Sequence, residues 1–132
     1  MSLVTAQGTA TTSLSGGNDL TSIAAQLGIS TATNATVSVG FNCATQQTGQ
    51  SNTFIGYNAA SSSLTGNGDT VLGYNAAPIL SGDNNVLVGT QAAVGIGAAF
   101  GNVAVGAGVA PSLSHGGSNV LLGALANARD GS

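Results

Sequence analysis

The sequence of 132 residues has very little charge. It contains no lysine and no glutamate, and its charged side chains are Arg129, Asp19, Asp69, Asp83 and Asp130. Binding to nucleic acid or to an anionic lipid surface depends on clustered Lys and Arg, so we expect neither partner. Disordered segments combine high charge with few aliphatic residues, whereas 42% of this chain is hydrophobic. The composition therefore indicates a packed core.

Cysteine, proline and long hydrophobic runs are also scarce. Cys43 is the only cysteine, which excludes a disulfide within the chain and suggests a small buried hydrophobe. The chain has 21 glycines but only two prolines and no Gly-X-Y register, unlike collagen. No apolar run approaches the ~20 residues that cross a bilayer, and no signal peptide is evident at the N-terminus. We expect one domain and no membrane partner.

The residues that usually carry catalysis or bind metals are missing or isolated. His115 is the sole histidine, so no His/Cys cluster can form a zinc site. The segment 66–69 resembles one piece of a calcium-binding nonapeptide, but it is not repeated every nine residues, which favours a turn. Gly95 and Gly97 lack the strand-to-helix setting of a dinucleotide loop, and no base is placed to activate a serine. We expect no enzyme and no cofactor.

The main positive signal is a repeat of 16 or 17 residues. A glycine follows a short aliphatic stretch six times, at Gly40, Gly56, Gly73, Gly89, Gly106 and Gly123. The residue three positions before each glycine is β-branched, the residue one position before is large and aliphatic, and an Asn or Asp stands four positions before in five of the six repeats. These columns predict short strands over 37–39, 53–55, 70–72, 86–88, 103–105 and 120–122.

Strands that repeat at this spacing would stack as parallel strands of a β-solenoid. Side chains alternate along a strand, and both faces of these strands are mostly apolar, as in parallel sheets that are covered on both sides. The Asn/Asp column is assigned to turns that tolerate a left-handed backbone. A fainter second strand is expected around Leu64, Leu80, Ile96 and Leu113, with Pro78 and Pro111 at corners.

Stacked coils would also align like side chains outside the strands, about 4.8 Å apart. Asn42, Asn58, Asn75 and Gln91 would then form an amide ladder, and Phe41, Tyr57 and Tyr74 an aromatic one. Stabilisation between coils is the simpler interpretation of both ladders. A contact surface for a glycan or a partner protein is the alternative.

Only one face of each strand can point into its own coil, so the other apolar face needs a cover. A closed symmetric association of identical chains supplies it most simply. For core and trimer packing the candidates are Val39, Phe54, Ile55, Val71, Leu72, Leu87, Val88, Val103, Val105, Leu121 and Leu122.

The segments 52–60 (NTFIGYNAA) and 102–110 (NVAVGAGVA) resemble the repeats of trimeric β-roll heads. Such heads occur in bacterial trimeric autotransporter adhesins and in phage fibre or appendage proteins. The resemblance covers roughly residues 34–128 and implies an all-β, left-handed parallel roll of about six coils, three chains around one axis, and an extracellular or virion setting. The stalk, anchor and signal peptide of the autotransporters are not evident, which favours a virion protein.

Residues 1–33 do not fit the repeat, which occupies 34–128 and leaves 129–132 as a tail. Asn18 or Asp19 can begin a short helix that ends at Gly28. We expect an arm that attaches to a major capsid protein or another virion protein, with Leu3, Val4, Leu14, Leu20, Ile23 and Leu27 as its apolar contacts. Residues 17–30 also resemble the first half of a LysM peptidoglycan-binding module, whose second helix and closing strand are not evident.

Three functions without catalysis fit these features. A trimeric cement protein that decorates and stabilises a phage head comes first, because six coils make a body only about 25–30 Å tall. A short phage fibre or an adhesin domain that binds a host receptor is the alternative. Ice binding comes third, since a regular array of threonines is missing. The expected location is the capsid surface of a virion.

Overall fold

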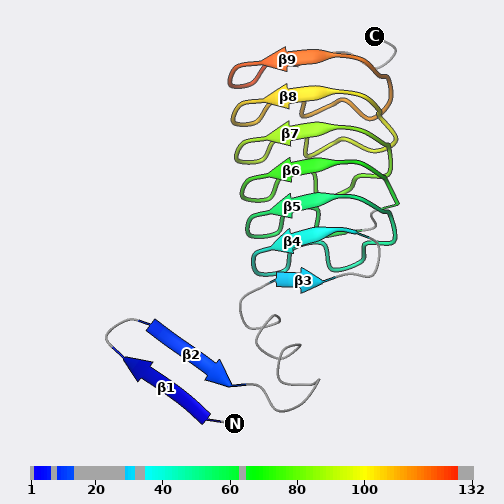
Figure 1. Ribbon diagram of the computed structural model, residues 1–132. Coiled ribbons are helices and arrows are strands. Elements are labelled where there is room, and N and C mark those ends of the chain that lie inside the picture. Colours follow the sequence, from blue (N-terminus) through cyan, green and yellow to red (C-terminus); the bar gives the residue numbers. More distant parts are fainter. Residues whose placement is uncertain (1, 7–8, 14–28, 32–34, 63–64, 128–132) are drawn as a thin grey trace.

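The protein is a β-solenoid in a computed structural model that describes residues 2–6, 9–13, 29–31, 35–62 and 65–127 (Figure 1). All regular elements of these residues are strands, and no helix occurs among them. Two short strands, β1 (Ser2–Ala6) and β2 (Thr9–Ser13), pair antiparallel as a hairpin. The remaining strands form one sheet: β3 (Ile29–Thr31), β4 (Val37–Val39), β5 (Thr53–Ile55), β6 (Thr70–Leu72), β7 (Val86–Val88), β8 (Val103–Val105) and β9 (Val120–Leu122).

The strands β4 to β9 lie at the six positions that the repeat predicts, and each pairs with the next in parallel. The prediction of an all-β parallel solenoid is confirmed, with about five complete turns between its six repeat strands. Equivalent columns face one another, for example Val37 and Thr53, then Phe54 and Val71. The register is therefore set by position in the repeat.

The coils differ in length, yet the strands remain aligned. From Gly40 to Gly56 the spacing is 16 residues and from Gly56 to Gly73 it is 17, but β4, β5 and β6 pair column on column. The extra residue is accommodated outside the strands. On the side opposite the sheet, the described residues form no regular second strand. Only two isolated parallel bridges occur there, Ser62–Ile79 and Phe100–Gly117.

The middle residue of each strand points into the coil. Ser38, Phe54, Val71, Leu87, Ala104 and Leu121 are all buried. Leu80, Ile96 and Leu113 meet them from the opposite side and are fully buried. They form no strand, so the prediction of a second strand is wrong in the described residues; Leu64 lies outside them. Alanines fill the remaining space, for example Ala59, Ala76 and Ala92. The face of each strand that carries the middle residue is therefore the inward face, which the sequence pattern did not determine.

The repeat glycine is explained by the distance between neighbouring coils. Gly56 has a φ of +139°, and a Cβ at this position would lie 2.3 Å from the carbonyl oxygen of Gly73 in the next coil. No L side chain avoids such a contact, and its backbone conformation is one that glycine alone adopts readily. The aliphatic-glycine motif thus marks where the strand ends and the chain turns.

The assignment of the Asn/Asp column to turns is wrong. The residue one position before the Asn/Asp column is the left-handed one in every repeat: Ala35, Ser51, Gly68, Asn84, Gly101 and Ser118. The column itself is buried except at its last member, Asn119, and its side chains bond from coil to coil.

The predicted arm contributes to the sheet. Within residues 1–33, β3 pairs antiparallel with β4, with Ile29 opposite Val39. The sheet of the solenoid therefore begins at Ile29, ahead of the predicted start at residue 34. The predicted helix that ends at Gly28 lies outside the described residues, as does most of the LysM-like stretch.

Candidate interaction surface

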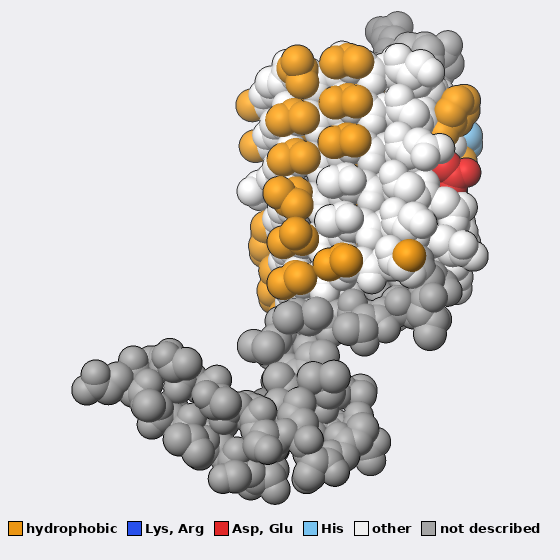
Figure 2. Space-filling view, viewed as in Figure 1, with side chains coloured by type: hydrophobic (Ala, Val, Ile, Leu, Met, Phe, Trp, Pro, Cys, Tyr) orange, Lys and Arg blue, Asp and Glu red, His pale blue; other side chains and the backbone are white. Residues whose placement is uncertain are grey.

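The outward side of β4–β9 carries two parallel columns of side chains, which we call the outer apolar face. One column contains the last residue of each strand: Val39, Ile55, Leu72, Val88, Val105 and Leu122. The other contains the first residue: Val37, Thr53, Thr70, Val86, Val103 and Val120. Figure 2 shows the first column as continuous and the second as interrupted by two polar side chains. The interruption corresponds to Thr53 and Thr70.

The outer apolar face is accessible in the single chain. Ile55, Leu72 and Val105 are 37–40% exposed, and Val120 and Leu122 at the last strand are about 70% exposed. One column is aliphatic over all six strands and the adjoining column over four of them, and together they form a contiguous apolar patch. Patches of this kind on a protein of few charges mark sites of association.

The residues predicted for core and trimer packing divide between the two sides of the sheet. Phe54, Val71, Leu87 and Leu121 lie in the core. The others belong to the outer apolar face: Val39, Ile55, Leu72, Val88, Val103, Val105 and Leu122. Of the predicted arm residues, Leu3 and Val4 are in β1, whereas Leu14, Leu20, Ile23 and Leu27 lie outside the described residues.

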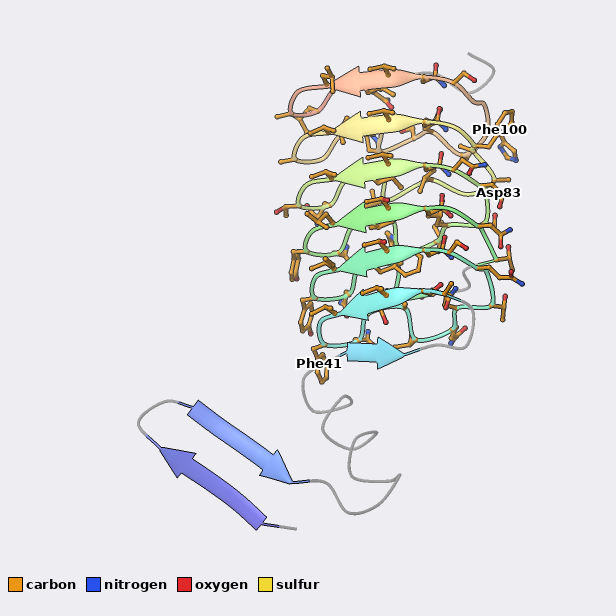
Figure 3. All side chains as sticks on the ribbon, in the orientation of Figure 1. Phe41, Asp83 and Phe100 are labelled. Atoms are coloured by element: carbon orange, nitrogen blue, oxygen red, sulfur yellow. The ribbon has the colours of Figure 1, made fainter. Side chains whose placement is uncertain are left out.

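A second exposed feature is the aromatic stack of Phe41, Tyr57 and Tyr74 at the turn after the strands. The ring centroids of Phe41 and Tyr57 are 5.6 Å apart and those of Tyr57 and Tyr74 are 5.5 Å apart, with nearly parallel planes. Phe41 is the first ring of the stack (Figure 3). Beside it, Nδ2 of Asn42 donates to Oδ1 of Asn58 at 2.7 Å. The predicted aromatic ladder and the first step of the predicted amide ladder are confirmed.

The Asn/Asp column forms a hydrogen-bonded asparagine ladder inside the coils: Asn52, Asp69, Asn85, Asn102 and Asn119. In each step the backbone N–H of one member donates to Oδ1 of the member in the previous coil, for example Asn102 to Asn85 at 3.1 Å. The Nδ2 group of Asn102 also donates to Oδ1 of Asn85, at 3.1 Å. Thr36 continues the column, and its Oγ1 accepts the N–H of Asn52 at 3.2 Å.

The sequence pattern did not predict that the ladder is a buried hydrogen-bond network, because Asn and Asp next to glycine also indicate turns. A signal was available. Turn positions accept several residue types, whereas this column is Asn in four of its six members. Such uniformity indicates an amide that must donate and accept at once.

Asp69 is the only carboxyl in the ladder. Its Oδ1 accepts the backbone N–H and Nδ2 of Asn85 at 2.8 and 3.1 Å, and the side chain is 1% exposed. Its Oδ2 is the one buried side-chain polar atom of the described residues without a hydrogen-bond partner. Burial raises the pKa of Asp69 to about 6, although the hydrogen bonds from Asn85 lower it.

Cys43 lies in the small-residue column, half-buried and packed against the core. Its Sγ donates to the carbonyl oxygen of Phe54 at 3.5 Å. Burial raises the pKa of the thiol to about 11, so the thiolate that nucleophilic or metal chemistry requires is disfavoured near neutral pH. This geometry agrees with the expectation of a small packing residue.

Within the described residues, no group of three or more His, Cys, Asp and Glu side chains comes together as a metal site. In the same part of the chain no helix is long and apolar enough to cross a membrane. Two exposed features of the described residues can contact a partner: the outer apolar face and the aromatic stack.

The comparisons with known proteins give no relative for this chain. No protein-family model matches it, and neither a curated protein nor a solved structure does.

Proposed function

We propose that the protein is a structural component of a phage particle, a homotrimer that decorates and stabilises the surface of the head. In this proposal three left-handed rolls cover one another's outer apolar faces. The N-terminal arm, with its short helix, attaches the trimer to the major capsid protein or to another virion protein. The observation that carries the proposal is the exposed pair of apolar columns along β4–β9.

The outer apolar face supports self-association because of its shape and composition. It repeats at the spacing of the coils, so an identical face offers the same periodicity for interdigitation. Its members carry no charge, and burying aliphatic surface contributes about 25 cal/mol per Å². A closed ring of identical chains buries every copy of the face, whereas an open chain of contacts would leave faces exposed at its ends.

The virion setting is supported by the resemblance of the repeats to trimeric β-roll heads. The arm is suited to attachment, since its first segments pair with each other as β1 and β2 and add nothing to the solenoid sheet. A short phage fibre or an adhesin domain is the second candidate. The exposed aromatic stack favours it, because aromatic rings are frequent contacts at recognition surfaces.

Trimer formation is tested with Val105→Asp, which places a charge on the outer apolar face. The matched control is Ala107→Asp in the same coil, because Ala107 is exposed and lies beyond the strand. We expect a trimeric mass for the wild type and for the control by light scattering coupled to size exclusion. The Val105 variant should remain folded but monomeric. A monomeric wild type at micromolar concentration would contradict the trimer.

Attachment to the particle is tested separately by deleting residues 1–28. The deletion retains β3, because β3 pairs with β4 and its loss would uncover the edge of the roll. We expect a folded roll that is absent from purified particles, with full-length protein as the control. Binding of the full-length protein should change little with salt, since residues 1–28 contain one charge, Asp19. Full occupancy by the truncated protein would place the attachment surface on the roll and remove the argument for the arm.

A further inference from the structure

The asparagine ladder has one member whose chemistry does not match its position. Three asparagines donate Nδ2 to a backbone carbonyl oxygen of the next coil: Asn52 to Gly66 at 2.9 Å, Asn85 to Ala99 at 3.0 Å and Asn102 to Gly116 at 3.4 Å. Asp69 has an oxygen, Oδ2, where these residues have an NH₂ group. An ionised carboxylate cannot donate a hydrogen bond.

The corresponding carbonyl oxygen for Asp69 is that of Gly82, because Gly82 precedes Asn85 by three residues, as Gly66 precedes Asp69. A Cβ on Gly66 would lie 2.5 Å from Oδ2 of Asp69 and 2.2 Å from the oxygen of Gly82. The two oxygens therefore flank the same point. No hydrogen-bond partner reaches Oδ2 among the described residues, and a charged acceptor that is buried close to another acceptor, without a donor, is unfavourable.

We propose that Asp69 is a protonation switch of the roll: its neutral carboxyl donates Oδ2–H to the carbonyl oxygen of Gly82, and ionisation breaks this bond and loosens the coil. In the protonated state the carboxyl copies the asparagine amide, with Oδ1 as acceptor and Oδ2–H as donor. The switch is a property of the single roll and does not depend on the proposed attachment to a capsid.

The electrostatic surroundings favour the neutral form. The part of the chain that the structure describes has no Lys or Arg, and its other carboxyl is Asp83, in the turn before Asn85. The pKa of Asp69 rises from 3.8 to about 6 because burial disfavours the charge; the two hydrogen bonds from Asn85 oppose this rise, and the nearby Asp83 carboxylate adds to it.

A pKa that is higher in the folded than in the unfolded state makes the neutral form the stabilising one. The stabilisation of the folded state by the neutral Asp69 carboxyl is complete below pH 3.8 and is lost as the pH rises through about 6. The unfolding equilibrium constant should then increase about 100-fold between pH 4 and pH 8 on account of this residue.

The direct test is an NMR titration of the full chain with ¹³C-labelled aspartate. The Cγ resonance of Asp69 is assigned by its loss in Asp69→Asn. We expect its midpoint near pH 6, and we expect only a small fall of that midpoint in the control variant Asp83→Asn. A midpoint at or below the ordinary value for aspartate would overturn the proposal.

The thermodynamic test compares urea unfolding of the wild type and of Asp69→Asn from pH 4 to pH 8. The variant supplies the missing donor at every pH, so its advantage over the wild type should grow with pH to about 100-fold in the unfolding constant. A difference that does not change with pH would refute the switch. So would stabilisation of the wild type at pH 8 by Na⁺, K⁺ or Ca²⁺, because a cation and not a proton would then lie between the two oxygens.

Discussion

Removing a central member of the asparagine ladder should damage the fold far more than removing its last member. Asn85 is fully buried. Its Nδ2 donates to Oδ1 of Asp69 at 3.1 Å and to the carbonyl oxygen of Ala99 at 3.0 Å, and its Oδ1 accepts both the N–H and Nδ2 of Asn102. Asn85→Ala deletes all of these bonds in one step.

The magnitude follows from the groups that lose their partners. The backbone N–H of Asn102 and the carbonyl oxygen of Ala99 would be left inside the coil without a partner. Each buried unsatisfied group costs about 1–3 kcal/mol, so the free energy of unfolding should fall by about 2–6 kcal/mol for the two groups. A domain of this size has about 5–15 kcal/mol in total, and Asn85→Ala should therefore remain folded but be clearly weakened.

The matched control is Asn119→Ala, at the end of the same ladder. Asn119 is only partly buried, and its Nδ2 donates to Oδ1 of Asn102 at 3.0 Å. Oδ1 of Asn102 keeps the backbone N–H of Asn119 as a partner at 3.0 Å. The free energy of unfolding should fall by about 0.5–1.5 kcal/mol in this variant, the net value of an ordinary hydrogen bond.

Both variants are compared with the wild type by urea unfolding at one pH and one protein concentration, followed by circular dichroism. The midpoint should fall strongly for Asn85→Ala and slightly for Asn119→Ala, with similar slopes. Equal effects of the two substitutions, or a loss below about 1 kcal/mol at Asn85, would show that the ladder does not stabilise the coils as described.

Two further predictions concern the core. Leu87→Asp should prevent folding, because Leu87 is fully buried and an unpaired charge there costs several kcal/mol; a soluble protein with an unchanged melting temperature would contradict the inward orientation of this column. Cys43→Ala should change the melting temperature little, because alanine occupies the equivalent positions 59, 76 and 92 and the thiol makes one weak contact to Phe54; a large loss of stability would show that the sulfur packs in a way that alanine cannot replace.

Much of the solenoid could be predicted because stacking repeats the same constraints in every coil. Each strand position has six independent examples in one chain, so the columns at Val39 and Leu87 can be identified without a relative. The aromatic stack follows from the same logic, since equal spacing places Tyr57 over Phe41. Because the repeats align with one another, equivalent positions can be compared within a single chain.

Two features were not assigned correctly from the pattern. Both faces of the strands are apolar, so nothing in the residue types distinguished the inward column of Phe54 from the outward column of Ile55. The Asn/Asp column lies next to true turn residues such as Ser51, and its burial depends on bonds between coils. The residue pattern describes one coil at a time. The inward face of the strands and the burial of the Asn/Asp column depend on how each coil closes and on how the coils stack.

The constant register of the strands and the variable length of the coils have a consequence for how such a chain can change. Because the sheet from β4 to β9 stays aligned whether a coil has 16 or 17 residues, insertions between the strands do not propagate to the next coil. Whole coils can be duplicated or lost in the same way, since each presents the same edges to its neighbours. The exposed positions of the connecting segments can therefore diversify or accept a foreign peptide, while the strands, the buried columns and the asparagine ladder preserve the scaffold that displays them.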